Sequence, residues 1–206
     1  MCNLPSLREL PYNAAEVRLS TSSTFVRIFP ILCCAATVWG AQVPRFSLED
    51  LVDGSQYIVH GRVIHTWTGW DAKHLYLWTH HEIEVADTLR GAPGVRVTVS
   101  EPGGSLDGVH QSFSGALPFV PGEEVVVFLY RTPIGFLRAA GGAQGKFTID
   151  RAGRARAHLA GAEVVDNPRA RRGTALASLD ALDVREFKRL VREVSGKRPA
   201  PPAGPE

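Results

Sequence analysis

The sequence has 206 residues, of which 44% are apolar, which is enough to fill the core of one domain with appendages and argues against two large domains. Its formal net charge of +2 is too small to imply nucleic acid or an acidic membrane as an obligatory partner. Acidic residues outnumber basic ones in residues 41–150, and the balance reverses in residues 151–206, which indicates a composition boundary near Asp150.

A secretory signal segment is predicted for residues 1–40. The apolar run 28–38 follows a basic residue, precedes small residues, and is too short to span a bilayer. We expect cleavage after Gly40, and a buried N-terminal helix is the alternative. Residues 1–25 are polar and unlike a signal, and they would not be translated if synthesis began at Val26. The sequence therefore predicts a periplasmic or extracellular protein with no stable membrane span after signal removal.

All three cysteines, Cys2, Cys33 and Cys34, lie within this signal segment. A mature chain without them contains no thiol, which excludes disulfide bonds, thiolate metal sites and cysteine nucleophiles. The glycine-rich segment 141–145 superficially resembles a phosphate-binding loop, but it has one residue too few between its glycines and leads into a strand pattern. We therefore expect no cofactor.

Period-two alternation of apolar and polar residues dominates residues 57–150 and predicts a series of short strands. After a short helix over 47–54, the expected strands cover residues 57–67, 75–89, 95–99, 123–130, 135–139 and 146–150. The first two form a long hairpin with a turn-rich connection, and the apolar run of the fourth suggests a strand covered on both faces. This pattern predicts a mainly β fold in which residues 41–150 form a small antiparallel β-barrel or sandwich.

The chain after residue 150 has a different character. Residues 151–178 are rich in Arg, Ala and Gly, and predict a hairpin extension or a linker. An amphipathic C-terminal helix is predicted over 179–196, with Asp183 and Glu186 forming a capping box. Its apolar residues recur at helical spacing: Phe187, Leu190, Val191 and Val194. We expect this stripe to pack on the barrel rather than to bind a partner, and residues 197–206 to form a disordered tail.

The first hairpin contains most of the histidines, which raises the question of a metal site. His65 and His81 are the candidate ligands, because we expect them to share a face of the hairpin. His80 and His81 are adjacent on a strand and so point to opposite faces, and no regular histidine spacing supports a closed site. We therefore predict no metal site, with His65 and His81 as the alternative.

A long polar loop is predicted over residues 101–115, and loops of this length without structure of their own are often functional. The loop contains Ser105, Asp107 and His110. Ser105 is not in a nucleophile elbow, but a Ser-His-Asp set is defined in space and stays open as an alternative. The predicted binding surface consists of this loop together with the tryptophans of the hairpin: Trp67, Trp70 and Trp78.

Several motifs resemble a group of secreted bacterial proteins without assigned function. They are Tyr-Ile-Val-His-Gly-Arg-Val at 57–63, Glu-Pro-Gly-Gly at 101–104, Pro-Phe-Val-Pro-Gly-Glu-Glu-Val-Val-Val-Phe-Leu at 118–129 and Ala-Gln-Gly-Lys-Phe at 143–147. Those proteins look like the oligonucleotide-binding (OB) barrel shared by tissue inhibitors of metalloproteinases and netrin modules. The resemblance covers about residues 48–150 and implies an OB-like barrel.

The resemblance does not carry the inhibitor mechanism with it. In the inhibitor family a mature N-terminal cysteine chelates the protease zinc and disulfides hold the barrel, whereas the mature chain expected here has no cysteine. No catalytic residue is available from the resemblance. A protease-inhibitor-like module would therefore have to act without cysteines.

Our functional prediction is an exported, non-catalytic binding module for an unknown protein or glycan partner. One alternative is a secreted metal-dependent or serine hydrolase that uses His65, His81, Asp107 and His110. Oligonucleotide binding is favoured by the aromatic residues, but export and the acidic balance of the barrel argue against a nucleic-acid partner.

Overall fold

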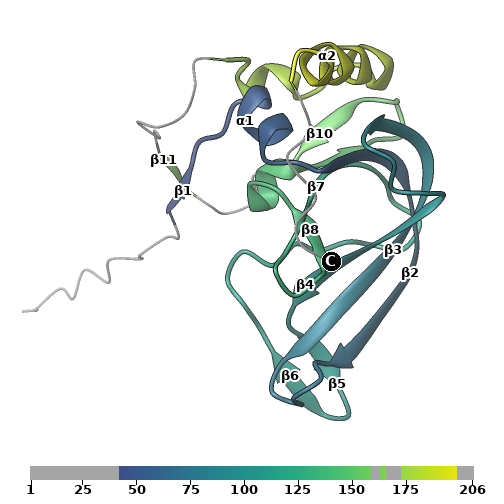
Figure 1. Ribbon diagram of the computed structural model, residues 1–206, viewed down its shortest axis with the longest axis vertical. Helices are drawn as coiled ribbons and strands as arrows, with labels where there is room; N and C mark the ends of the chain where they lie inside the picture. The colour runs from purple at the N-terminus through teal and green to yellow at the C-terminus, as the bar shows by residue number, and fades with distance from the viewer. Residues whose placement is uncertain (1–41, 159–162, 166–172, 199–206) are drawn as a thin grey trace, which may run out of the picture. The chain divides into compact units, whose positions relative to one another are not determined.

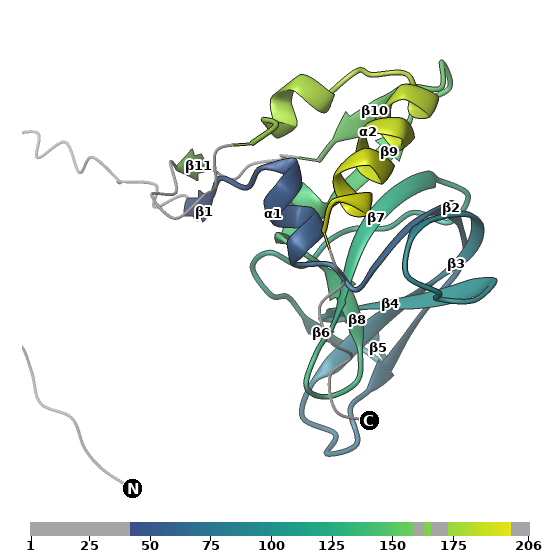
Figure 2. The same ribbon diagram turned by 45° about the horizontal axis from the view of Figure 1, so that its top comes forward.

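The computed structural model describes residues 42–158, 163–165 and 173–198 (Figures 1 and 2). The predicted signal segment 1–40 and most of the predicted tail lie outside these residues. The strands are β1 (Gln42–Pro44), β2 (Tyr57–Trp70), β3 (Leu77–Arg90), β4 (Arg96–Pro102), β5 (Gly104–Leu106), β6 (Val109–Gln111), β7 (Glu124–Arg131), β8 (Leu137–Ala139), β9 (Lys146–Ile149), β10 (Ala155–Ala157) and β11 (Glu163–Val165). The α-helices are α1 (Leu48–Asp53) and α2 (Val184–Gly196), and the 3-10 helices are η1 (Gly142–Gly145) and η2 (Leu176–Leu179).

Five strands pair in a closed ring, in the order β7, β2, β3, β4, β8 and back to β7. Neighbouring strands of the ring are antiparallel, except that β4 and β8 pair in parallel at Val99 and Leu137. Strands β9 and β10 extend the sheet beyond β7. The predicted mainly β fold with a C-terminal helix is confirmed, although the pairing that closes the ring is parallel rather than antiparallel.

The strands of the ring separate two apolar clusters. The inner cluster contains Val59, Val63 and Ile83, and the outer cluster contains Ile58 and is covered by the helices. Strand β7 contributes to both, because successive side chains of a strand point to opposite faces. Its inward residues are Val125, Val127 and Leu129, and its outward residues are Val126 and Phe128. The prediction that this strand is covered on both faces is therefore confirmed.

Helix α2 covers the outer cluster, as its apolar stripe predicts. Phe187 is fully buried and packs on Phe147, with 4.6 Å between ring centroids. Asp183 caps the helix by accepting a hydrogen bond from the Arg185 amide at 2.9 Å. The Glu186 carboxylate was expected to complete a capping box, but it accepts a hydrogen bond from the Arg189 guanidinium at 2.6 Å instead.

A reciprocal capping box occurs at α1, where the Ser47 hydroxyl accepts from the Asp50 amide and the Asp50 carboxylate accepts from the Ser47 amide. Helices α1 and α2 lie side by side at one end of the sheet (Figures 1 and 2). Among the residues that the structure describes, no helix is both long and apolar enough to cross a membrane.

Several strands are longer than the sequence predicts. Strand β2 continues through residues 68–70, which were expected to form a turn, and β4 continues to Pro102. The hairpin extension expected after residue 150 is present in part, because β10 pairs antiparallel with β9. Strand β11 pairs in parallel with β1, and residues 159–162 and 166–172 of the predicted linker lie outside the described residues.

Candidate functional site

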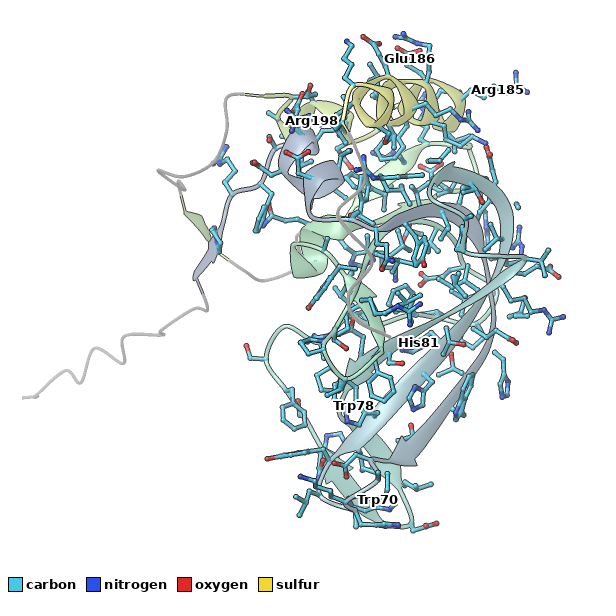
Figure 3. All side chains as sticks on the ribbon, viewed as in Figure 1. Trp70, Trp78, His81, Arg185, Glu186 and Arg198 are labelled. Atoms are coloured by element: carbon cyan, nitrogen blue, oxygen red, sulfur yellow. The ribbon has the colours of Figure 1, made fainter. Side chains whose placement is uncertain are left out.

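The three tryptophans of the predicted binding surface lie on the long hairpin of β2 and β3, each in a different setting. Figure 3 labels two of them, Trp70 and Trp78. Trp67 is 39% exposed. Trp78 packs edge-on against Phe136, with 4.8 Å between ring centroids, and Trp70 stacks on His74 at 6.0 Å near the tip of the hairpin. Trp67 is therefore the tryptophan with the largest accessible surface of the three.

Trp67 belongs to a row of rings on the outer face of the hairpin. Its indole packs against His65 on one side and His80 on the other, with 5.3 Å between centroids in each pair. His80 continues the row, because it meets Phe136 edge-on at 5.5 Å, and its Nδ1 lies 2.8 Å from the Ser100 hydroxyl. A cavity of about 320 Å³ lies beside His80, and its lining includes Ser100, Phe136, Arg96 and Arg131.

The predicted loop 101–115 has structure of its own, so the expectation of a structureless loop is wrong. Strands β5 and β6 pair around a turn at Asp107 and Gly108, both of which have positive φ. Ser105 and His110 face each other across this small hairpin, with 2.8 Å between Oγ and Nδ1. Asp107 lies in the turn, and no hydrogen bond in the described part of the chain joins it to His110. The structure thus brings together two members of the suggested Ser-His-Asp set, on an exposed hairpin, without the third.

The two segments predicted to form a binding surface do meet in space. The Gln111 side chain accepts a hydrogen bond from the Leu77 amide at 2.7 Å and donates one to the Leu75 carbonyl at 3.1 Å. Tyr76 and Phe113 pack edge-on, with 6.0 Å between centroids. These contacts bring Leu75, Tyr76 and Phe113 together. With Val109, which precedes Gln111 by two residues on the same strand, they are the four exposed apolar side chains that we call the hairpin end.

The double glycine of the Glu-Pro-Gly-Gly motif allows this arrangement. Gly103 and Gly104 have φ of 100° and 140°, a region that side chains rarely adopt. A Cβ on Gly104 would lie 2.5 Å from the Thr79 hydroxyl and 2.7 Å from the Thr68 methyl group. The glycines therefore let β5 cross closely over the inner face of the long hairpin, which positions the hairpin end.

His65 and His81 lie on opposite faces of the long hairpin, so the expectation that they share a face is wrong. His65 stacks on the exposed Trp67, whereas His81 is buried on the inner face, with its Nδ1 3.0 Å from the Thr66 hydroxyl. The cause is a β-bulge after Val63, which inserts one residue and places His81 opposite Thr66. Within residues 42–158, 163–165 and 173–198, no three His, Cys, Asp or Glu side chains gather as a metal site would require.

A buried polar cluster, which the sequence did not reveal, lies next to the inner core. The Lys146 ammonium donates hydrogen bonds to the Pro118 carbonyl and the Glu123 carboxylate, each at 2.5 Å, and is 4.3 Å from the centre of the Phe119 ring. Burial lowers the pKa of Lys146, and its ion pair with Glu123 opposes that shift. His81 packs on the same Phe119 ring at 4.8 Å. The lysine therefore joins β9 to the segment that precedes β7.

Glu101 is the second buried charge of this region. Its carboxylate accepts hydrogen bonds from the Arg138 guanidinium at 3.0 Å and the Leu117 amide at 3.4 Å. Burial raises the pKa of Glu101, and the charge of Arg138 opposes that shift. A cavity of about 400 Å³ lies between these groups and the inner face of the hairpin, and His81 and Phe119 also line it.

The groups at this cavity are suited to holding the fold rather than to moving protons. Burial, with smaller contributions from Lys146 and His80, lowers the pKa of His81 to about 4, which makes its imidazole a weak base. Glu101 is held by Arg138. Each titratable side chain thus already has a structural partner.

The depressed pKa of His81 predicts that the protein becomes less stable as the pH is lowered. In the unfolded chain this imidazole takes up a proton near its ordinary pKa of 6.5, whereas in the folded chain it does so near 4. The unfolded state therefore binds more protons between these values, so the free energy of unfolding should fall as the pH is lowered from 6.5 to 4. The expected loss is on the order of 3 kcal/mol. Urea unfolding across this range should show it, and His81→Gln should remove most of it; an equal loss in that variant would contradict the assignment.

The residues that carry the family resemblance have structural roles. Besides Glu101 and Lys146, the Gln144 side chain accepts a hydrogen bond from the Phe46 amide at 3.0 Å and donates one to the Pro44 carbonyl at 2.8 Å. A Cβ on Gly145 would overlap the Ala140 carbonyl. These motif residues therefore hold neighbouring segments of the fold together.

A scan against models of protein families finds no match, and a search of curated proteins finds none either.

Proposed function

We propose that this chain is an exported, non-catalytic interaction module that binds a protein partner through the hairpin end. The observation that carries the proposal is the exposure of four neighbouring apolar side chains on two hairpins: Leu75 at 57%, Tyr76 at 51%, Val109 at 41% and Phe113 at 37%. Soluble proteins seldom expose a contiguous apolar patch unless it contacts something. Aliphatic side chains such as Leu75 and Val109 offer no hydrogen bonds to a hydroxyl-rich glycan, which favours a protein surface.

The positions of the catalytic candidates support this reading. Ser105 and His110 are exposed on a small hairpin, and Asp107 lies in the turn of that hairpin with no hydrogen bond to His110 among the described residues. His65 and His81 are separated by the sheet. A hydrolase would need such groups to converge on one reacting atom. Support for export comes from the sequence of residues 1–40 alone.

Site-specific photo-crosslinking in the host tests the proposal. A photoreactive phenylalanine analogue at Tyr76 or Phe113 should give one discrete protein adduct in the cell envelope. The matched control is the same analogue at Val95, which is 80% exposed. Val95 lies in the connection between β3 and β4, at the end of β3 that is remote from the hairpin end. Because Tyr76 and Phe113 are themselves exposed, these changes leave the core intact.

A second variant tests whether Leu75 and Val109 contribute to partner binding. With the crosslinker at Tyr76, the double substitution Leu75→Ser and Val109→Ser should lower the adduct yield about tenfold, since it removes two apolar groups worth roughly 1 kcal/mol or more each when buried. Adducts of equal yield at Val95, or no protein adduct at Tyr76 and Phe113, would contradict the proposal. Adducts with glycan alone would show that the partner class is wrong.

A further inference from the structure

The distal part of β2 has an open edge. Strand β7 pairs with β2 from Tyr57 to Arg62. Two further backbone bonds, from the Val63 amide to the Glu123 carbonyl at 3.0 Å and from the Gly122 amide to the Val63 carbonyl at 2.7 Å, end this pairing. From Ile64 to Trp70 the only strand paired with β2 among the described residues is β3, on the other side. Alternate peptide groups of this stretch therefore face outward without a strand partner.

The side chains of this edge lack the features that usually prevent strands from pairing. Proteins block exposed edges with charged side chains, prolines, β-bulges or a covering segment. The stretch reads Ile-His-Thr-Trp-Thr-Gly-Trp and contains no lysine, acidic residue or proline, and its β-bulge lies at its start, before Thr66. Strand β5 lies over the inner face near Thr68, but β5 pairs with β6 and not with β2.

The edge at β10, in contrast to the distal edge of β2, is covered by another segment of the chain. There the Ala155 amide donates to the Leu182 carbonyl, and the Ala181 amide donates to the Ala155 carbonyl, each at 2.8 Å. Arg154 also forms a bridge with Asp183. The described part of the chain thus covers the edge at β10 with its own backbone, whereas no described segment pairs with the distal edge of β2.

We propose that this edge pairs antiparallel with the same edge of a second copy of the chain, about a two-fold axis at Trp67. An open strand edge is complementary to another extended backbone, and a two-fold interface uses one patch twice. Trp67 is the midpoint of the stretch from His65 to Gly69, so an axis there lets these residues, which follow the inserted Ile64, pair with the same residues of the second copy.

The register that this axis imposes is compatible with pairing. Thr66 lies opposite Thr68 of the second copy, and threonine pairs across strands are favourable. His65 lies opposite Gly69, so no two charged groups face each other. Trp67 lies opposite itself, and its side chain, 39% exposed in one chain, gains a partner. This dimer goes beyond the proposed function, because it uses the backbone edge of β2 and not the hairpin end.

A charge-swap experiment on the full chain purified from its host tests the axis directly. Sedimentation velocity should show the wild type passing from monomer to dimer below about 100 μM. Trp67→Lys and Trp67→Glu should each raise the dissociation constant at least about tenfold, because like charges then face each other across the axis. Mixing the two variants should restore a one-to-one dimer, because opposite charges then meet.

Each outcome decides the proposal. Leu75→Lys, at the hairpin end, is the control that should leave the wild-type dissociation constant unchanged. A wild type that stays monomeric up to this concentration would overturn the proposal, and would leave an extended segment of another protein as the occupant of the edge. A Trp67→Lys dimer as tight as the wild type would also overturn it. So would a mixture of the two variants that stays monomeric while circular dichroism shows both folded.

Discussion

Replacing Lys146 by alanine should lower the free energy of unfolding by about 3–5 kcal/mol, because removing one partner of a buried ion pair leaves the other charge without compensation. The side chain of Lys146 is 1% exposed and that of its partner Glu123 is 13% exposed. The substitution also removes the hydrogen bond to the Pro118 carbonyl and the contact with the Phe119 ring. Chemical denaturation at neutral pH measures the loss.

Two comparisons separate the ion pair from simple loss of volume. Lys146→Met keeps the length of the side chain, and combining it with Glu123→Gln should recover part of the loss, since no unpaired charge then stays buried. Lys197→Ala, which removes a lysine that is 70% exposed and paired with Glu193, should change the free energy of unfolding by less than about 0.5 kcal/mol. A Lys146→Ala variant as stable as Lys197→Ala would refute the role we assign to the buried lysine.

Gly61→Ala should destabilise the fold by about 3 kcal/mol, whereas Gly69→Ala in the same strand should not. A Cβ on Gly61 would overlap the Glu84 carbonyl of β3 and lie 2.9 Å from the Ile83 side chain, so the two long strands would have to separate. A Cβ on Gly69 meets nothing within 4 Å. There alanine should leave stability unchanged or raise it by up to about 1 kcal/mol, because it restricts the unfolded chain.

Thermal and urea unfolding of the two variants test this contrast, and each serves as the control for the other. The intensity of near-ultraviolet circular dichroism from Trp67 and Trp78 reports whether the hairpin stays packed. Equal stability of Gly61→Ala and Gly69→Ala would show that β2 and β3 do not approach each other as closely at Gly61 as the structure has them.

The alternation of the sequence was sufficient to find the strands of the ring, because a strand with one face on a core repeats with period two. The continuous apolar run of β7 also predicted a strand covered on both faces, because this strand lies between two apolar clusters. The sequence did not predict that the distal part of the long hairpin is a strand. Gly69 and its neighbours read as a turn because glycine marks turns more often than strands, yet here they continue a strand that reaches beyond the ring.

The site was harder to predict than the fold because it depends on register and on distant contacts. One inserted residue after Val63 reversed the faces of the residues that follow it, so the expectation that His65 and His81 share a face was wrong. The sequence did carry a signal for the β5–β6 hairpin, the dipeptide Asp107-Gly108, which is typical of tight hairpin turns.

The buried ion pairs had no such local signal. Lys146 of β9 and Glu123, which directly precedes β7, are 23 residues apart, and Glu101 of β4 and Arg138 of β8 are 37 apart. Nothing in the spacing of these residues indicates that their side chains meet. The pairing of β9 with β7 brings the first pair together, and the pairing of β8 with β4 brings the second together.

Helix α2 also determines when the molecule can finish folding. The outer cluster holds Phe128 and Phe147, and the side chains that cover them from α2 are Phe187 and Val191. A ribosome makes the chain from its N-terminus, so these two residues emerge after every strand of the sheet. A nascent chain that has reached only residue 183 still lacks these two side chains, so the outer cluster is completed only when the last helix has been made.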